Sequence, residues 1–351
     1  MMTMTNEPLK ILSVYKWSTM GGVERVLLNR AHAFKLHRKS IVQHVYFFED
    51  GGGLRAFKEY IATHELSDYI KVVEAFVPEY YDVILPIDTP EIFEQMSDYG
   101  KVIMECHTSY RENRQYVRKL PESIGGLIVP SKNFKNSIMD EVPLFLRDKV
   151  KLVRNCIPGL RTSSPIFSPW QKTPLAYVGR IDKLKNIEEI FQIFASAVKR
   201  FGDRFILVLA GPIINEDIDF EKMVGDYGLL GRIVYLPPVR FHKVPLLLDM
   251  LKFGKGIFLS SSKSESFGLS VAEAMAHGLP TVLSDIDAHR ELVEDSRRYL
   301  YRIGDINEAT DKLAELLDNY EFHSGELEQL SHRFGADAFV RDWLDALELT
   351  R

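Results

Sequence analysis

Two glutamates with seven residues between them stand in the segment SSKSESFGLSVAEAMAHGLP, residues 261–280. Glu265 lies in a polar loop after an apolar run, and a carboxylate in such a loop suits hydrogen bonds from ligand hydroxyls. Glu273 follows Ser270 by three positions, which is the spacing of a capping box at the start of a helix. Glu273 therefore has a structural interpretation beside a binding one.

A second chemical signal is the segment VGRIDKLKN, residues 178–186, which follows an apolar run and precedes an amphipathic one. Arg180 can hold phosphate oxygens with two parallel hydrogen bonds, and Lys185 adds a point charge. The segment is either a clamp for a diphosphate or a solvated basic loop.

Glycines at two predicted helix starts offer backbone N–H groups to an anion. Gly21 and Gly22 open the first helix, and Gly268 and Leu269 follow Phe267 at the start of another. The adjacent glycines are equally compatible with a plain tight turn. They do not form a dinucleotide-binding fingerprint, because the G-x-G-x-x-G spacing is absent.

In the N-terminal half, His107 ends an apolar run and opens the basic and aromatic stretch of residues 107–120. A histidine at the end of a strand serves in catalysis or hydrogen bonding, or it is a satisfied, half-buried side chain. Tyr110, Arg111 and Arg114 could receive an anionic or lipid-linked acceptor. The alternative is a solvated helix face.

All these residues follow predicted strands. Short apolar runs such as residues 11–17 alternate with amphipathic segments such as 21–37, and this alternation predicts an α/β fold with doubly wound parallel sheets. Ligands of such sheets bind at the carboxyl ends of the strands. By the same reasoning, the loops at 210–219, which include Gly211, and at 235–241 are expected to hold a nucleobase.

Residues 157–174, IPGLRTSSPIFSPWQKTP, interrupt this alternation with four prolines and no apolar period. We interpret residues 158–173 as a linker between two domains. The chain is predicted to end in two helices, one over residues 306–320 and a longer one that runs to Leu349.

The bulk composition excludes several classes of protein. The 351 residues carry 44 basic and 49 acidic side chains, a net charge of −5 that does not support nucleic-acid binding. There is no apolar run of about 20 residues and no apolar signal core, so we expect a cytoplasmic protein. Cys106 and Cys156 are expected to be buried, reduced thiols. Because no His/Cys cluster is present, we expect no metal and no cofactor.

The motifs together resemble a known family. Glu265 and Glu273, with Phe-Gly between them and A-x-x-x-G-x-P after them, resemble the E-x7-E motif of retaining glycosyltransferases of the GT-B fold, family four. GGVER, VPSKNFKNS, VGRIDKLKN and LAGP resemble further motifs of that family, in the same order. One departure is Asn186, which stands where the family usually has a glycine after its lysine.

The resemblance implies two Rossmann-like domains that face each other across a cleft. The N-terminal, acceptor-side domain would cover residues 1–157, and the nucleotide-sugar-binding domain would cover 174–335. A final helix, 336–351, would cross back to the N-terminal domain. The donor would be a nucleoside-diphosphate sugar, and the reaction would transfer a hexose-type sugar with retention of the anomeric configuration.

The resemblance also implies roles for individual residues. Two cations would bind the diphosphate, one glutamate the sugar hydroxyls and the other the ribose. The predicted catalytic residues are His107, Arg180, Lys185 and Glu265. The predicted donor-binding residues are Gly21, Gly22, Arg180, Lys185, Gly211, Glu265, Phe267, Gly268, Leu269 and Glu273. The predicted acceptor residues are Tyr110, Arg111 and Arg114.

The expected acceptor is a saccharide or a lipid-linked hydroxyl, with peripheral contact to the inner face of a membrane as one possibility. Cell-envelope polysaccharide or glycoconjugate synthesis is the expected setting, and the oligomeric state stays open. Two alternatives remain: a nucleotide-sugar epimerase of the same architecture, and a non-catalytic donor-binding subunit. Incubation with the donor alone separates the two enzymes, because only an epimerase isomerises it.

Overall fold

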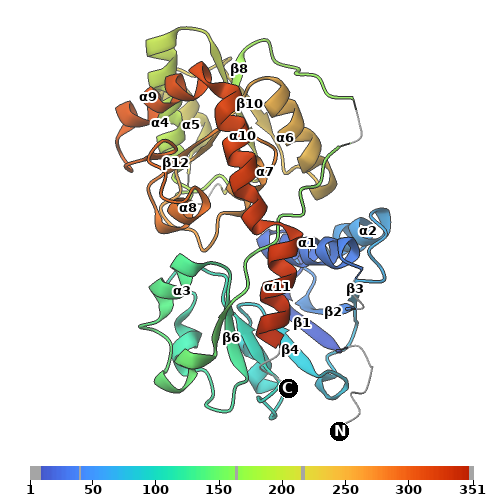
Figure 1. Ribbon diagram of the computed structural model, residues 1–351. Helices are drawn as coiled ribbons and strands as arrows, with labels where there is room; N and C mark the ends of the chain where they lie inside the picture. Colours follow the sequence, from blue (N-terminus) through green and yellow to red (C-terminus); the bar gives the residue numbers. More distant parts are fainter. Residues whose placement is uncertain (1–8, 39–40, 163–164, 215–217, 348–351) are drawn as a thin grey trace. The chain divides into compact units, whose positions relative to one another are not determined.

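The computed structural model describes residues 9–38, 41–162, 165–214 and 218–347. The chain divides into two compact units (Figure 1). Unit 1 comprises residues 1–158 and 334–351, and unit 2 comprises residues 159–333. The division falls at the start of the predicted linker, residues 158–173. The final helix, α11 (Ala336–Leu347), belongs to unit 1.

Unit 1 is built on parallel strands. The first four pair in the order β3-β2-β1-β4, and the last three pair in the order β5-β6-β7. Parallel bridges from Ile84 to Val102 and from Ile87 to Glu105 join β4 to β5. The strand order therefore reverses between β1 and β4, which is the switch point of a Rossmann sheet. The strands are β1 (Ile11–Trp17), β2 (Gln43–Glu49), β3 (Ile70–Val72), β4 (Val83–Pro86), β5 (Ile103–Glu105), β6 (Gly126–Val129) and β7 (Val150–Leu152).

The helices of unit 1 cover this sheet. Helix α11 packs against α1, where the Phe34 ring lies 5.6 Å from that of Phe339 and 5.9 Å from that of Trp343. Pro90 opens a short 3-10 turn, η2 (Pro90–Glu94). The other helical elements are α1 (Gly22–Leu36), α2 (Leu54–Thr63), η1 (Pro78–Tyr80), η3 (Gln115–Lys119), α3 (Lys132–Ile138) and η4 (Leu144–Lys149).

Unit 2 has a parallel sheet in the order β10-β9-β8-β11-β12-β13, with its switch point between β8 and β11. The central strands are buried on both faces, which explains their continuous apolar sequences. The two-residue strand β13 was not predicted. The strands are β8 (Thr173–Val178), β9 (Phe205–Ala210), β10 (Ile233–Leu236), β11 (Ile257–Ser260), β12 (Thr281–Ser284) and β13 (Leu300–Tyr301).

The long helix predicted to run to Leu349 is wrong as a single element. It is divided into α10 and α11 by a 3-10 turn, η6 (His332–Phe334), and Gly335, while Leu349 lies outside the described residues. The helical elements of unit 2 are α4 (Ile187–Phe201), α5 (Phe220–Asp226), η5 (Phe241–Lys243), α6 (Val244–Phe253), α7 (Leu269–Ala276), α8 (Asp287–Leu292), α9 (Ile306–Asp318) and α10 (Tyr320–Ser331).

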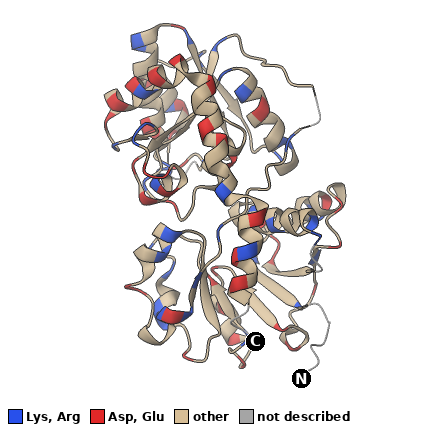
Figure 2. Cartoon of the chain, viewed as in Figure 1, with Lys and Arg blue, Asp and Glu red and all other residues tan. Residues whose placement is uncertain are grey.

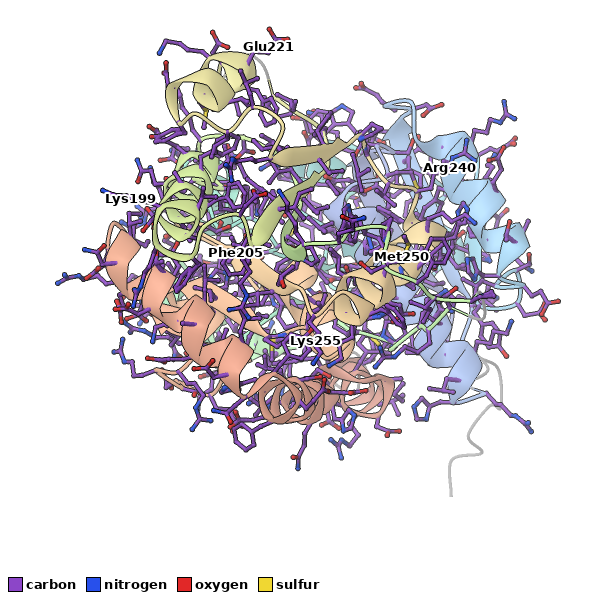
Figure 3. All side chains as sticks on the ribbon, turned by 90° about the horizontal axis from the view of Figure 1, so that it is seen from above. Lys199, Phe205, Glu221, Arg240, Met250 and Lys255 are labelled. Atoms are coloured by element: carbon purple, nitrogen blue, oxygen red, sulfur yellow. The ribbon has the colours of Figure 1, made fainter. Side chains whose placement is uncertain are left out.

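Acidic and basic residues are interspersed along the chain of both units (Figure 2). Within unit 2, Phe205 of β9 is buried, whereas Lys199 and Glu221 lie at the periphery (Figure 3). Cys106 and Cys156 are buried free thiols, and burial raises the pKa of both. Over the described ranges, no helix is long and apolar enough to cross a membrane.

Candidate active site

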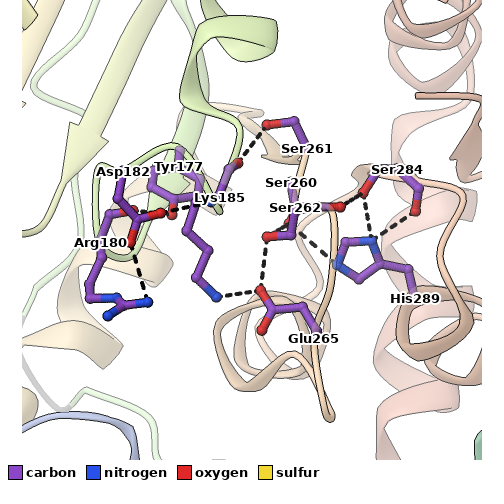
Figure 4. A network of polar contacts seen from close by, with 10 residues as sticks. All are labelled: Tyr177, Arg180, Asp182, Lys185, Ser260, Ser261, Ser262, Glu265, Ser284 and His289. Carbon is purple, nitrogen blue, oxygen red and sulfur yellow. Dashed lines mark hydrogen bonds and ion pairs between the residues drawn. The ribbon is translucent and has the colours of Figure 1, made fainter. Parts of the chain in front are cut away.

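An ion pair spans the switch point of unit 2 (Figure 4). Lys185 follows β8 and Glu265 follows β11, and the Lys185 Nζ lies 2.5 Å from the Glu265 Oε1. The hydroxyl of Ser262 donates to the same carboxylate oxygen at 2.8 Å. Because β8 and β11 are neighbours in the sheet, two residues 80 positions apart meet at its carboxyl edge.

The surroundings of Glu265 keep it ionised. Burial by itself raises the pKa of this carboxyl, but the charge and hydrogen bond of Lys185, with His289 and Ser262, lower the pKa below its ordinary value. The Lys185 and Glu265 side chains are 19% and 18% exposed, so a ligand can reach both. An ionised carboxylate accepts hydrogen bonds only, which suits hydroxyl groups.

The loop of residues 178–186 holds Arg180 beside this pair. The hydroxyl of Tyr177 donates to the Arg180 carbonyl at 2.6 Å, and Asp182 lies 3.2 Å from the Arg180 guanidinium. The other Asp182 oxygen accepts the Lys185 backbone N–H at 2.7 Å. The Arg180 side chain is 51% exposed and can turn to a diphosphate.

Asn186 accounts for the departure from the family motif. Its φ is +54°, in the left-handed region that glycine and asparagine adopt most readily. Its side-chain Nδ2 donates to Glu189 at 2.7 Å, and Ser261 donates to the carbonyls of Lys185 and Asn186. The asparagine therefore supplies the backbone conformation that a glycine would supply.

Gly211 marks a close approach between two loops at the carboxyl edge. A Cβ on Gly211, whose φ is +142°, would lie 1.9 Å from the Gly179 carbonyl oxygen. The loops after β8 and β9 therefore touch through their backbones, and only a residue without a side chain fits.

Helix α7 begins at the predicted pair Gly268 and Leu269 and not at the capping-box residue Ser270. Its N-cap is Gly268, with φ +92°, and its first residue is Leu269, so the expected capping box of Ser270 and Glu273 does not form. Glu273 lies in the second turn and is partly buried. The Phe267 side chain is buried, at 2% exposure, and packs within the unit rather than lining the loop surface.

A buried histidine that the sequence reasoning missed supports Glu265. The Nδ1 of His289 donates to the Ser284 carbonyl at 2.8 Å, which leaves Nε2 to accept a hydrogen bond from the Ser260 hydroxyl at 3.3 Å. Burial lowers the His289 pKa, although the Glu265 charge opposes this effect. No spacing in the sequence linked His289, in α8, to strands β11 and β12.

In unit 1, a carboxylate of helix α1 binds backbone N–H groups of the loop that contains Gly21 and Gly22. The Glu24 carboxylate accepts the backbone N–H groups of Thr19, Met20 and Gly21, the last two at 2.8 and 3.0 Å. Gly21 thus directs its N–H inward, contrary to the expected free donor. A Cβ at Gly22 would meet nothing within 4 Å, so that backbone stays open to a ligand.

His107 lies at the carboxyl end of β5, and its Nε2 is 3.0 Å from Glu105. Arg30 holds Glu105 through two contacts of 2.8 and 2.6 Å. Burial raises the pKa of Glu105, but Arg30 and His107 lower it to about 2. Since this carboxylate only accepts hydrogen bonds, His107 must carry its proton on Nε2. The Asp88 carboxylate accepts the His107 backbone N–H at 3.1 Å.

The arginines among the predicted acceptor residues form ion pairs within unit 1. Arg114 is 6% exposed; its guanidinium donates to both oxygens of Glu141 at 3.0 and 2.9 Å and to the Ser109 carbonyl at 2.6 Å. Arg114 therefore stabilises its loop, contrary to the expectation of an acceptor contact. Arg111 is 65% exposed and also pairs with Glu141 at 2.9 Å. Tyr110 is partly buried in the same loop.

Two Asp-Ile-Asp triplets, at 217–219 and 285–287, bear on metal binding. Asp217 lies outside the described residues. Asp285 accepts hydrogen bonds from Arg290 and Arg297, each at 2.5 Å, so cations already compensate its charge. In the portion of the chain that the structure describes, no group of three His, Cys, Asp or Glu side chains is arranged to hold a metal.

Solved structures share the fold of this chain. Anabaena HepE in complex with UDP and glucose has a TM-score of 0.76 at 17% identity, covering 97% of this chain and 99% of that one. A Staphylococcus aureus TarM mutant, in complex with fondaparinux, α-GlcNAc-glycerol and UDP, has a TM-score of 0.74 at 12% identity, with 96% and 99% covered. The chain therefore has the GT-B fold, with two Rossmann-like domains.

Sequence comparison gives a more specific result for one part of the chain. Residues 166–338 match the model of a family described as glycosyl transferases group 1. N-acetyl-alpha-D-glucosaminyl L-malate synthase of Bacillus anthracis is 27% identical over 200 residues, which are 56% of this chain and 48% of that protein. The chain spans about half the length of the first curated relatives it matches.

Proposed function

We propose that the chain is a retaining glycosyltransferase. It would transfer a hexose-type sugar from a nucleoside-diphosphate sugar to a saccharide or lipid-linked hydroxyl, in cell-envelope polysaccharide or glycoconjugate synthesis. The observation that carries this proposal is the Lys185–Glu265 pair at the switch point of unit 2, beside the exposed guanidinium of Arg180. The family match, which includes all three residues, supports it.

The site supplies the chemistry of each step. Glu265 accepts hydrogen bonds from hydroxyls of the donor sugar, and Arg180 and Lys185 bind the diphosphate. As the bond from the anomeric carbon to the diphosphate oxygen breaks, charge grows on the leaving oxygen and the two cations stabilise it. The acceptor hydroxyl then attacks the oxocarbenium-like carbon from the same face and transfers its proton to the leaving diphosphate.

We further propose that no metal takes part, since the two cations can compensate the diphosphate charge. Turnover should persist in excess chelator. Activity that chelator abolishes and magnesium or manganese restores would refute this part of the proposal.

Donor binding is the direct test of function. Thermal shifts should be measured with UDP-, GDP-, ADP- and TDP-glucose, and a true donor raises the melting temperature by mass action. We expect UDP-glucose to raise the melting temperature, because two solved structures with this fold are UDP complexes. The shift should shrink in Lys185→Ala, with Lys183→Ala as the control from the same loop. A donor isomerised without acceptor would instead establish an epimerase.

A further inference from the structure

An exposed tryptophan ends the first strand of unit 1. Trp17 is the last residue of β1 and is 43% exposed, whereas Trp343 is fully buried. Its indole Nε1 donates to the Glu49 Oε2 at 3.3 Å, and Glu49 is its partner in register at the end of β2. The hydrogen bond fixes the plane of a large aromatic ring at the carboxyl edge of the sheet.

A second ion pair accompanies this ring. The Lys16 Nζ lies 2.7 Å from the Glu91 Oε1 and 4.6 Å from the centre of the Trp17 ring. Lys16 is on β1 and Glu91 is in η2, the element that follows β4, so the pair spans the switch point of unit 1. The Lys185–Glu265 pair has the same place in unit 2. Switch points are where open α/β sheets bind ligands.

The loops around Trp17 are held rigidly. The Ser18 hydroxyl donates to Asp50 at 3.0 Å, and the Gly53 N–H donates to the Ser18 carbonyl at 2.7 Å. A Cβ on Gly53 would lie 2.6 Å from the backbone of Thr19. The loops after β1 and β2 therefore pack backbone against backbone, and the ring is ordered before any ligand arrives.

The chemistry of the cluster selects a neutral sugar. The Lys16 ammonium lies over the Trp17 ring, so a sugar would use the opposite face. That electron-rich face attracts the positively polarised C–H groups of a pyranose. The carboxylates of Glu49 and Asp50 can accept hydrogen bonds from sugar hydroxyls. Glu91 pairs with Lys16 and so compensates its charge, which leaves the cluster with a net negative charge. A phosphate would therefore be repelled here.

We propose that Trp17 and Glu49, beside the Lys16–Glu91 ion pair, form a subsite that binds a neutral sugar ring. The identification of that sugar as part of the acceptor rests on the proposed transferase function. The binding itself does not, because it requires only unit 1.

Tryptophan fluorescence of the full chain tests the binding. The probes are the methyl glycosides of glucose, galactose and N-acetylglucosamine, with glucose 6-phosphate as the anionic comparison. We expect a saturable change with a neutral glycoside in the wild type and in Trp170→Phe, its loss in Trp17→Phe, and a weaker response to the phosphate. No saturable change with any neutral glycoside, or an unchanged response in Trp17→Phe, would overturn the subsite.

Kinetics test the assignment to the acceptor. Trp17→Ala should raise the acceptor KM about tenfold, equivalent to about 1.4 kcal/mol, and leave hydrolysis of UDP-glucose unchanged. The acceptor KM of Trp17→Phe should lie between the values of the wild type and of Trp17→Ala, because phenylalanine keeps an aromatic face. Tyr80→Ala is the control, since Tyr80 is an aromatic of unit 1 that is 71% exposed. An unchanged acceptor KM in Trp17→Ala overturns the acceptor subsite. Glycoside binding at Trp17 without any donor turnover would refute the transferase function alone.

Discussion

The ammonium of Lys185 and the carboxylate of Glu265 are 2.5 Å apart, and each is reachable from solvent. Within unit 2, the pair joins the loops that follow the two strands at the switch point. A bound diphosphate would draw Lys185 toward its own charge and leave Glu265 to accept hydrogen bonds from sugar hydroxyls. The ion pair therefore holds both groups in place before the donor binds.

Removing either cation of this loop should slow the chemical step. Arg180→Ala and Lys185→Ala should each cost about 2–4 kcal/mol of activation free energy, as loss of one preorganised donor does. The measurement is kcat at saturating donor and acceptor. Lys183→Ala is the control, because that exposed lysine lies between them in sequence. Full activity in both variants would mean that the loop does not hold the diphosphate.

Glu105 should make the stability of unit 1 depend on acid. Its folded pKa is about 2, below the ordinary value of 4.5, so its contribution is fully present above pH 4.5 and is lost as the pH falls toward 2. Glu105→Gln should lower the free energy of unfolding by about 3–5 kcal/mol at pH 7, because it leaves Arg30 buried and unpaired. The difference in unfolding free energy between the wild type and Glu105→Gln should become smaller below pH 4.5.

Trp343 can report this effect. Its ring centre lies 4.8 Å from the Arg30 guanidinium carbon, and substituting Trp17 and Trp170 by Phe leaves it as the only tryptophan. Urea unfolding would be followed through its fluorescence between pH 3 and 7. Glu65→Gln is the exposed control, with a side chain that is 87% exposed. Equal deficits at all pH values would contradict the prediction.

Asn186 should tolerate glycine better than alanine. A residue with a Cβ pays a steric cost of roughly 1–2 kcal/mol in the left-handed conformation that Asn186 adopts. Asn186→Ala should therefore lower the melting temperature of unit 2 more than Asn186→Gly, although both lose the hydrogen bond to Glu189. Equal losses in the two variants would show that the side-chain hydrogen bond matters and the backbone conformation does not.

Gly211 should not accept any side chain. Gly211→Ala places a methyl group against the Gly179 carbonyl and should destabilise unit 2 by at least about 2 kcal/mol. Gly225→Ala is the matched control, because that helical position is open and alanine favours helices by roughly 1 kcal/mol over glycine. Differential scanning calorimetry of both variants measures the contrast. A Gly211→Ala variant as stable as the wild type would refute the close approach of the two loops.

The strands and most helices followed from the sequence because buried parallel strands are continuously apolar and their flanking helices are amphipathic. The first and last residues of the helices were harder to predict from the sequence. The prediction of a capping box at Ser270 was wrong because Gly268, in the left-handed conformation, is the N-cap of α7. The prediction of one long final helix was wrong because its two halves belong to different units, α10 to unit 2 and α11 to unit 1.

The sequence by itself determined the residue types and their order: a cationic loop after one strand, a glutamate loop after another, and a histidine after a third. Only the tertiary structure decided their partners. The neighbours of a parallel strand are set by crossover connections rather than by distance along the chain. Thus Lys185 meets Glu265 across 80 positions, Arg30 meets Glu105 across 75, and Arg114 turns inward to Glu141. Composition cannot state whether a charge is paired, because pairing depends on burial and on contacts made between distant segments.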